Sequence, residues 1–199
     1  MQYSLDLIFK LVWQLLTLML LPNIHSMIDY KDHKYLDLIL IFLKQIGIPF
    51  RLEKIKSEQF LPGILISNGS LIIDVDQLLF PGDIMHEAGH IALAPPEIRN
   101  SLNNQIDKQL DFDMATHELM AVLWSYAAAV EAKIPPIVVF HPEAYKGESE
   151  FLIQSFEQGN YNGLPMLQWL GMTYDEQKAI ANNTKPFPHM ISWLRPLKK

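Results

Sequence analysis

The residues whose types and spacing point most directly to chemistry are His86-Glu87-Ala88-Gly89-His90. This segment fits the pattern H-E-x-x-H, in which two histidines stand four residues apart. On a helix, residues at this spacing lie on one face, so both imidazoles can converge on one metal ion. The chain contains no cysteine, so His, Asp or Glu side chains must hold any metal. We therefore expect a zinc ion (Zn2+) bound by His86 and His90.

Glu87 directly follows the first expected ligand and is the candidate catalytic residue. Zinc lowers the pKa of a water molecule toward about 7, and a neighbouring carboxylate can take the proton as a general base. The flanking residues 84–85 and 91–93 are apolar, which predicts a buried helix. Burying an unpaired polar group costs roughly 2–7 kcal/mol, and a metal satisfies all three polar side chains at once. Two core histidines bonded to the backbone are the alternative interpretation.

A third ligand has to come from another part of the chain, because a catalytic zinc site has three protein ligands. The segment 114–133, MATHELMAVLWSYAAAVEAK, predicts a second apolar helix. Glu118 shares an inward face of this helix with Ser125, and a carboxylate in such an apolar helix needs a cation. Glu118 is therefore the preferred third ligand, and Glu131 near the helix end is expected to be solvated. The alternative ligands are, in order, His117, Asp113 and Asp111.

The first half of the chain is predicted to form one helix followed by a small antiparallel sheet. Apolar residues recur through Lys34 to Gly47, and residues 50–55 alternate between apolar and polar. In residues 63–76, two β-branched runs flank Asn68-Gly69, which predicts a hairpin with a type I′ turn. The strand after this turn, residues 71–76, is a candidate for the sheet edge that borders the cleft and binds a peptide.

The second half is predicted to be helical. Asp83 is expected to cap the H-E-x-x-H helix, which Pro95-Pro96 ends, and a polar loop spans residues 97–113. Shorter helices are expected around residues 148–158, 164–170 and 174–181. The predicted fold class is α+β and zincin-like, with the small antiparallel sheet packed on the active-site helix and a helical C-terminal extension. Residues 27–199 form one domain, with a core of about 34–136 and an extension of 137–199.

The order and motifs of these elements resemble the ImmA/IrrE-type zinc metallopeptidases over roughly residues 34–136. In that family the third ligand is a Glu in an E-x-x-A-x-x-(F/W)-A-like setting, matched here by Glu118, Ala121 and Trp124. Ser125 stands where the family has Ala. The resemblance implies zinc-dependent peptide hydrolysis with Glu118 as third ligand. No helix-turn-helix module is recognisable, so a link to DNA cannot be inferred.

Some polar residues outside the motif are weaker candidates for a role in catalysis. His141, Tyr126 and Tyr145 are of types that can donate a hydrogen bond to the oxyanion of a tetrahedral intermediate. Residues of these types are more often structural or on the surface, so the structural interpretation is preferred for each of them. The remaining histidines lack metal-ligand spacing and are expected to be exposed: His25, His33 and His189.

Composition and charge limit the class of protein and the kinds of partner that can be expected. The chain has 199 residues, a net charge of −6 and 49% hydrophobic residues, which suits one globular domain. The charge gives no footprint for direct binding of nucleic acid. The absence of cysteine is compatible with the cytoplasm. We expect the partner to be a peptide or protein substrate.

The segment 1–26 is strongly apolar, and its role is open. Residues 5–22 are apolar but interrupted by Asp6, Lys10 and Gln14. The segment is compatible with a membrane or export signal, with an amphipathic packing helix, or with an extension that precedes a true start at Met27. A cytoplasmic location is expected unless this segment exports or anchors the chain.

Two functions follow from the sequence. The leading hypothesis is a zinc-dependent metallopeptidase that hydrolyses peptide bonds with a zinc-activated water and Glu87 as general base. The alternative is a non-catalytic zinc-binding module that acts through protein–protein contacts. A fourth protein ligand, such as His117 or Asp113, would favour this alternative, because catalysis needs an open coordination position.

Overall fold

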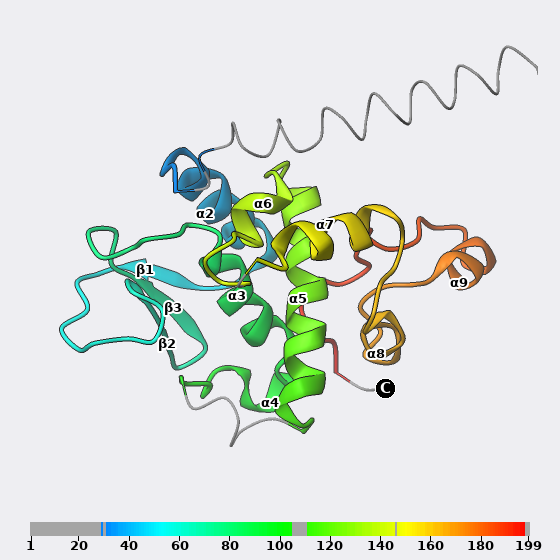
Figure 1. Cartoon of the computed structure of the whole chain (residues 1–199). Helices are drawn as coiled ribbons and strands as arrows, with labels where there is room; N and C mark the ends of the chain where they lie inside the picture. Colours follow the sequence, from blue (N-terminus) through cyan, green and yellow to red (C-terminus); the bar gives the residue numbers. More distant parts are fainter. Residues whose placement is uncertain (1–28, 30, 105–110, 146, 198–199) are drawn as a thin grey trace, which may run out of the picture.

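The computed structural model describes residue 29 and residues 31–104, 111–145 and 147–197 (Figure 1). The interpretations of residues 1–26, His25 included, therefore lie outside the described residues. Within the described ranges, none of the helices has the length and apolar character needed to span a membrane. The architecture is mixed α+β, with one small sheet and several helices, as the sequence predicts.

Helix α2, Lys34–Ile46, opens the described fold and confirms the first predicted helix. It ends at Gly47, which adopts a left-handed conformation with φ of 80° and donates its N–H to the carbonyls of Leu43 and Lys44. A glycine takes this conformation without steric cost. The buried face of α2, including Ile39, Phe42 and Leu43, packs in the same core as helix α3.

The sheet differs from the prediction in pairing and in strand order. Its strands are β1 (Phe50–Leu52), β2 (Ile64–Ser67) and β3 (Ser70–Ile73), in the order β1-β3-β2. The hairpin is confirmed, because β2 and β3 are antiparallel and both Asn68 and Gly69 have positive φ. The expected antiparallel sheet is wrong, because β1 pairs parallel with β3.

Strand β3 lies in the centre of the sheet and so cannot be the edge predicted for residues 71–76. The edges are β1 and β2. The predicted strand 50–55 also stops early, at Leu52, because the chain leaves the sheet into the loop 53–62. This loop connects β1 to β2, which lies at the opposite edge of the sheet. The alternation of apolar and polar residues along a strand does not indicate which strand it pairs with.

Helices α3 (Asp83–Leu93) and α5 (Met114–Glu131) pack side by side in the centre of the molecule (Figure 1). A Cβ added to Gly89 would lie 3.2 Å from the Ala121 carbonyl oxygen, so the missing side chain lets the two helices approach closely. Helix α5 ends two residues before the predicted Lys133, whose φ is 57°. The N-cap of α3 is Gly82, and the expected capping role of Asp83 is wrong.

The remaining helices are short, and two of them, at residues 96–99 and 136–139, are not predicted from the sequence. Helix α4 (Pro96–Arg99) lies inside the predicted polar loop, and α6 (Pro136–Val139) follows α5. The three helices expected in the tail are present as α7 (Ser149–Glu157), α8 (Leu164–Trp169) and α9 (Glu176–Ala181). After α9 the chain returns to the side of α5, where the Trp124 indole donates to the carbonyl of Trp193 (Figure 1).

The returning tail also holds the C-terminal end of α3. The backbone N–H of Arg195 donates to the carbonyl of Ala92, and its guanidinium pairs with both carboxylate oxygens of Asp111 at 2.9 and 2.7 Å. Arg99 donates to the carbonyls of Ile91 and Ala94. The guanidinium of Arg99 and the backbone N–H of Arg195 therefore satisfy carbonyls that the end of a helix leaves unpaired.

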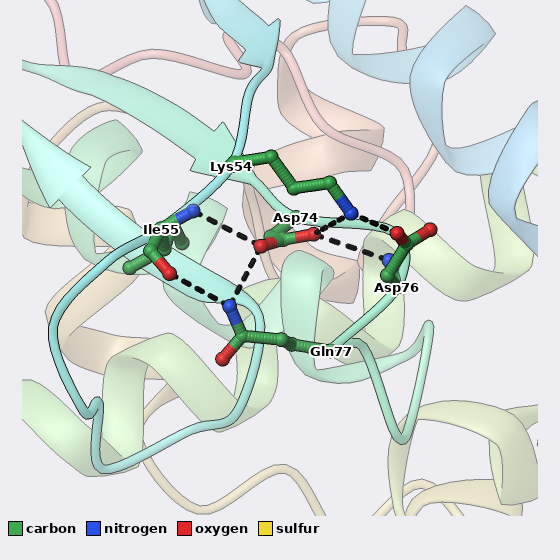
Figure 2. Close-up of polar contacts among 5 residues, drawn as sticks. All are labelled: Lys54, Ile55, Asp74, Asp76 and Gln77. Atoms are coloured by element: carbon green, nitrogen blue, oxygen red, sulfur yellow. Dashed lines mark hydrogen bonds and ion pairs between the residues drawn. The ribbon is translucent and has the colours of Figure 1, made fainter.

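The loop 53–62 is tied to the sheet by the buried carboxylate of Asp74 (Figure 2). Asp74 accepts hydrogen bonds from the backbone N–H of Ile55 at 3.0 Å and from the side chain of Gln77 at 2.7 Å. Lys54 lies 3.5 Å from Asp74 and also pairs with Asp76. The backbone bond from Ile55 and the bonds from Gln77 and Lys54 outweigh burial and lower the pKa of Asp74.

We expect Asp74→Ala to lower the melting temperature at neutral pH, because it leaves the buried N–H of Ile55 without its acceptor. The folded state lowers the pKa of Asp74, so its contribution is present above the unfolded value of about 3.9 and is lost as pH falls through the folded value. The difference from wild type should therefore shrink in acid. Thermal unfolding followed by circular dichroism measures both effects.

The matched control is Asp76→Ala, because the Asp76 side chain is 74% exposed and pairs with Lys54 at the surface. An exposed ion pair contributes little to stability. If both variants lower the melting temperature equally, Asp74 is not the group that ties down the loop.

Candidate metal centre

Three side chains from α3 and α5 converge at the interface of the two helices. His86 and His90 lie one turn apart on α3, and Glu118 lies near the start of α5. The two Nε2 atoms are 3.2 Å apart, and Glu118 Oε2 lies 3.2 Å from Nε2 of His86. Glu118 Oε1 lies 3.4 Å from Nε2 of His90. Together these residues form a group that could hold a metal ion.

The alternative ligands occupy other positions. His117 is fully buried behind His90, and the Nδ1 atoms of the two rings are 3.0 Å apart. Asp113 is the N-cap of α5 and accepts from the backbone N–H and the hydroxyl of Thr116. Asp111 pairs with Arg195. Each of these three residues therefore pairs with a group other than the Nε2 atoms of His86 and His90, which are the atoms that face Glu118.

A pocket of about 830 Å³ opens beside this group. Glu87, the candidate base, lines the pocket together with the three converging side chains. The other polar lining residues are Asp83, Asn104, His141, Glu143 and Tyr145. The apolar lining residues are Phe60, Leu61, Pro62, Ile64, Phe80, Met114, Val122 and Ala144. The pocket is thus lined by both polar and apolar side chains, and the three converging residues are among the polar ones.

Burial keeps two of the histidines neutral. It lowers the pKa of His90 to about 3, and the positive charge that His86 can carry acts in the same direction. Burial also lowers the pKa of His117 to about 4. Burial disfavours the protonated form of His86 as well. The carboxylates of Glu118 and Glu87 outweigh this effect and raise the pKa of His86. Partial burial raises the pKa of Glu118, but its hydrogen bond with His86 and the charges of the neighbouring histidines together outweigh burial and lower this pKa.

Glu87 has the protonation behaviour of a buried carboxyl group. Burial raises its pKa to about 7, and the negative charges of Glu118 and Asp83 act in the same direction, while His86 opposes them. A carboxyl group with a pKa near neutrality can both accept and release a proton under ordinary conditions. A nearby cation favours the ionised form of such a group.

The tail contributes to the pocket through His141, which the sequence flagged as a weak candidate. Its ring is buried, stacks on Phe80 at a centroid distance of 4.0 Å, and accepts the backbone N–H of Ala144 at Nδ1. Its Nε2 therefore carries the proton and donates to Asp83 at 2.9 Å. This pair explains why Asp83 does not cap α3, since its carboxylate is turned to the tail.

The two tyrosines that are candidate oxyanion donors occupy different environments in the structure. Tyr145 lines the pocket, whereas Tyr126 packs against Phe156 with ring centroids 4.8 Å apart. Burial raises the pKa of Tyr145 to a value far above its usual range, so its hydroxyl remains a donor. Sequence reasoning missed Asn104, Glu143 and Asp83 as pocket residues, because nothing in their local pattern sets them apart. His33 and His189 are exposed, as predicted.

Comparison with protein-family models, with curated proteins and with solved structures finds no match to this chain. Function therefore has to be inferred from the geometry of the site and from the residues that form it.

We expect the metal-free protein to bind one divalent transition-metal ion per chain, with zinc as the probe, and to release protons on binding. Because the pKa of His86 is raised above the ordinary histidine value of about 6.5, a proton competes with the metal at and below that pH. Affinity should therefore rise with pH until His86 is neutral. Isothermal titration calorimetry in buffers of different ionisation enthalpy measures the protons released.

Glu118→Ala should weaken zinc binding by more than about 100-fold, since loss of a ligand costs more than loss of an outer partner. Glu143→Ala is the matched control, because both carboxylates line the pocket and their side chains are 44% and 42% exposed. Equal zinc affinity in the two variants would remove Glu118 from the ligand set.

Proposed function

We propose that this protein is a zinc-dependent metallopeptidase, in which His86, His90 and Glu118 hold the metal and Glu87 is the catalytic base. The observation that carries the proposal is the arrangement of the three ligands: they converge from one side, and Glu87 lies on the wall of a large pocket that opens beside them. A catalytic metal site requires this combination of three protein ligands and one open position.

Zinc is the metal that fits the donor set and its spacing best. Zinc binds histidine nitrogen at about 2.0–2.1 Å and carboxylate oxygen at about 2.0–2.2 Å in a tetrahedron, so ligand atoms are roughly 3.3–3.5 Å apart. The separations of 3.2, 3.2 and 3.4 Å between the ligand atoms agree with this value. Two imidazoles with one carboxylate also suit zinc better than magnesium or calcium, which prefer oxygen ligands.

The chemistry divides between the metal and Glu87. When bound, zinc polarises the carbonyl of the scissile peptide bond and makes a water molecule acidic. Hydrolysis adds the oxygen and one hydrogen of water to the carbonyl carbon side and delivers the other proton to the leaving amine. Glu87 is the carboxylate beside the ligands that can take this proton and later release it. Its raised pKa suits both steps.

An extended peptide is the substrate that the pocket suits. Edge strand β2 borders the pocket through Ile64, and an extended chain can add to an exposed strand edge. The outward N–H of Ile66 donates to the side-chain oxygen of Asn104 at 2.7 Å, so an amide carbonyl already binds at this edge. Eight apolar side chains line the pocket beside its polar groups, which favours peptides with apolar side chains near the scissile bond.

The resemblance to the ImmA/IrrE-type metallopeptidases supports the same activity. Ser125, which stands where the family has Ala, is accommodated between the helices. Ser125 is fully buried, and its hydroxyl donates to the carbonyl of Ala121 at 2.7 Å, within α5. The departure therefore leaves the packing of α5 on α3 intact.

The non-catalytic alternative is less well supported. It would be favoured by a fourth protein ligand, but His117 faces the far nitrogen of His90 and Asp113 caps α5. Among the described residues, the group with metal-ligand geometry comprises His86, His90 and Glu118. An open position has no use in a purely structural zinc site.

We expect Asn104→Ala to lower KM for a peptide substrate by about 2- to 10-fold with little change in kcat. The variant removes a side chain that competes with the peptide for the N–H of Ile66, and one hydrogen bond contributes about 0.5–1.5 kcal/mol. Initial rates over a range of peptide concentrations give both constants. A higher KM would count against peptide addition at β2.

Glu87→Gln should reduce peptide hydrolysis by about 10²- to 10⁴-fold while zinc content stays at one per chain, because it removes the base and keeps the ligands. Zinc-loaded protein is incubated with a defined library of peptides, and new termini are identified by mass spectrometry. Glu131→Gln, at the exposed end of α5, is the control. Unchanged cleavage in Glu87→Gln, or none by the zinc-loaded wild type, would overturn the proposal.

A further inference from the structure

His117 directly precedes the expected ligand Glu118 on α5, yet it lies in a different environment. It has no exposed surface, and its ring is nearly parallel to that of His90, with centroids 5.0 Å apart and an interplanar angle of 11°. The Nδ1 atoms of the two rings are 3.0 Å apart. The two imidazoles thus share a hydrogen bond on the side of His90 that faces away from Glu118.

A count of protons decides the direction of this bond once a metal is bound. His90 presents Nε2 to His86 and Glu118, at 3.2 and 3.4 Å. A metal ligand needs a bare nitrogen, so the single proton of neutral His90 must lie on Nδ1. This proton can then be donated to Nδ1 of His117, which must carry its own proton on Nε2. The opposite direction would put a proton on Nε2 of His90 and block the metal.

We propose that His117 is a positioning residue of the metal centre: it accepts the Nδ1–H of His90 and so fixes the tautomer and ring orientation that leave Nε2 of His90 free to bind metal. This inference rests on the metal site of the proposed function and not on peptide hydrolysis. An outer partner of this kind is usually a carboxylate or a backbone carbonyl. In this protein the neutral imidazole of His117 is the hydrogen-bond acceptor instead.

A second observation separates this role from simple packing. Within the described part of the chain, Nε2 of His117 is buried and has no hydrogen-bond partner. A buried polar atom without a partner destabilises a fold, and an apolar side chain of similar size would avoid this penalty. The histidine is therefore costly for stability, and its Nδ1 contact with His90 is what it contributes in return.

The choice of a neutral acceptor also has a consequence for charge. A carboxylate behind His90 would add a further negative charge to a site that already holds Glu87 and Glu118. The imidazole orients His90 without adding charge. It therefore leaves the electrostatic balance among the metal, Glu118 and Glu87 undisturbed.

The direct test is the tautomer of each histidine in the zinc-loaded wild-type chain. Long-range proton–nitrogen correlation spectra of protein labelled with ¹⁵N-histidine distinguish Nδ1–H from Nε2–H. We expect His90 to carry its proton on Nδ1 and His117 on Nε2, with assignments from single-histidine variants. A proton on Nδ1 of His117 would overturn the inference. If wild-type chain binds no zinc, the metal site and this inference fall together.

Two variants test the role of the acceptor. The side-chain oxygen of Asn can replace Nδ1 of His as acceptor, whereas Leu has none. We expect His117→Leu to weaken zinc binding by about 10- to 100-fold, and His117→Asn to stay within about 3-fold of wild type. Zinc affinity is measured by competition with a chromophoric chelator, and the melting temperature of the metal-free variants reports folding.

The outcomes separate the inference from the proposed function. Equal zinc affinity in wild type, His117→Leu and His117→Asn overturns the positioning role and leaves the ligand set and the peptidase proposal standing. Equal losses in both variants, with metal-free melting temperatures lowered alike, also overturn it, since a packing role then explains the loss. Peptide cleavage absent from zinc-loaded wild type overturns the peptidase proposal alone.

Discussion

The close approach of α3 and α5 is the constraint on which the candidate site depends. Gly89 stands between the two histidines of α3, and a Cβ at this position would lie only 3.2 Å from the backbone of α5. Because glycine leaves this space free, Glu118 on α5 comes within 3.4 Å of both Nε2 atoms. A glycine in a helix costs about 1 kcal/mol relative to alanine. The helix interface offsets this cost, since it brings the three side chains together.

The second feature of the site is the amount of polar chemistry held in an apolar interior. His90 and His117 are almost fully buried, and burial holds the pKa of each well below its usual range. His86 and Glu118 share an ion pair, which raises the one pKa and lowers the other. An ionised pair in a buried site is unfavourable unless its remaining polar atoms are satisfied. A cation held by this group would satisfy the nitrogens and the carboxylate together.

The C-terminal extension takes part in the site and in the helix that carries it. At one end of α3, His141 donates to Asp83, and at the other end Arg195 bonds to the carbonyl of Ala92. The same tail places His141, Glu143 and Tyr145 on the pocket wall. The loop 53–62, held by Asp74, supplies the facing wall. The pocket is thus assembled from segments that lie far apart in the chain, around one short helix.

The sequence alone determined the elements whose signal is local. The hairpin at Asn68-Gly69, the helices and the common face of His86 and His90 each follow from a turn type or a period, which neighbouring residues encode. Glu118 was chosen on chemical grounds, as a carboxylate in an apolar helix. The parallel pairing of β1, the edge position of β2, the bond between Asp83 and His141 and the place of His117 behind His90 were decided only by the tertiary structure. Each of these joins segments that are distant in sequence, and a local pattern holds no record of which distant segment will pack against it.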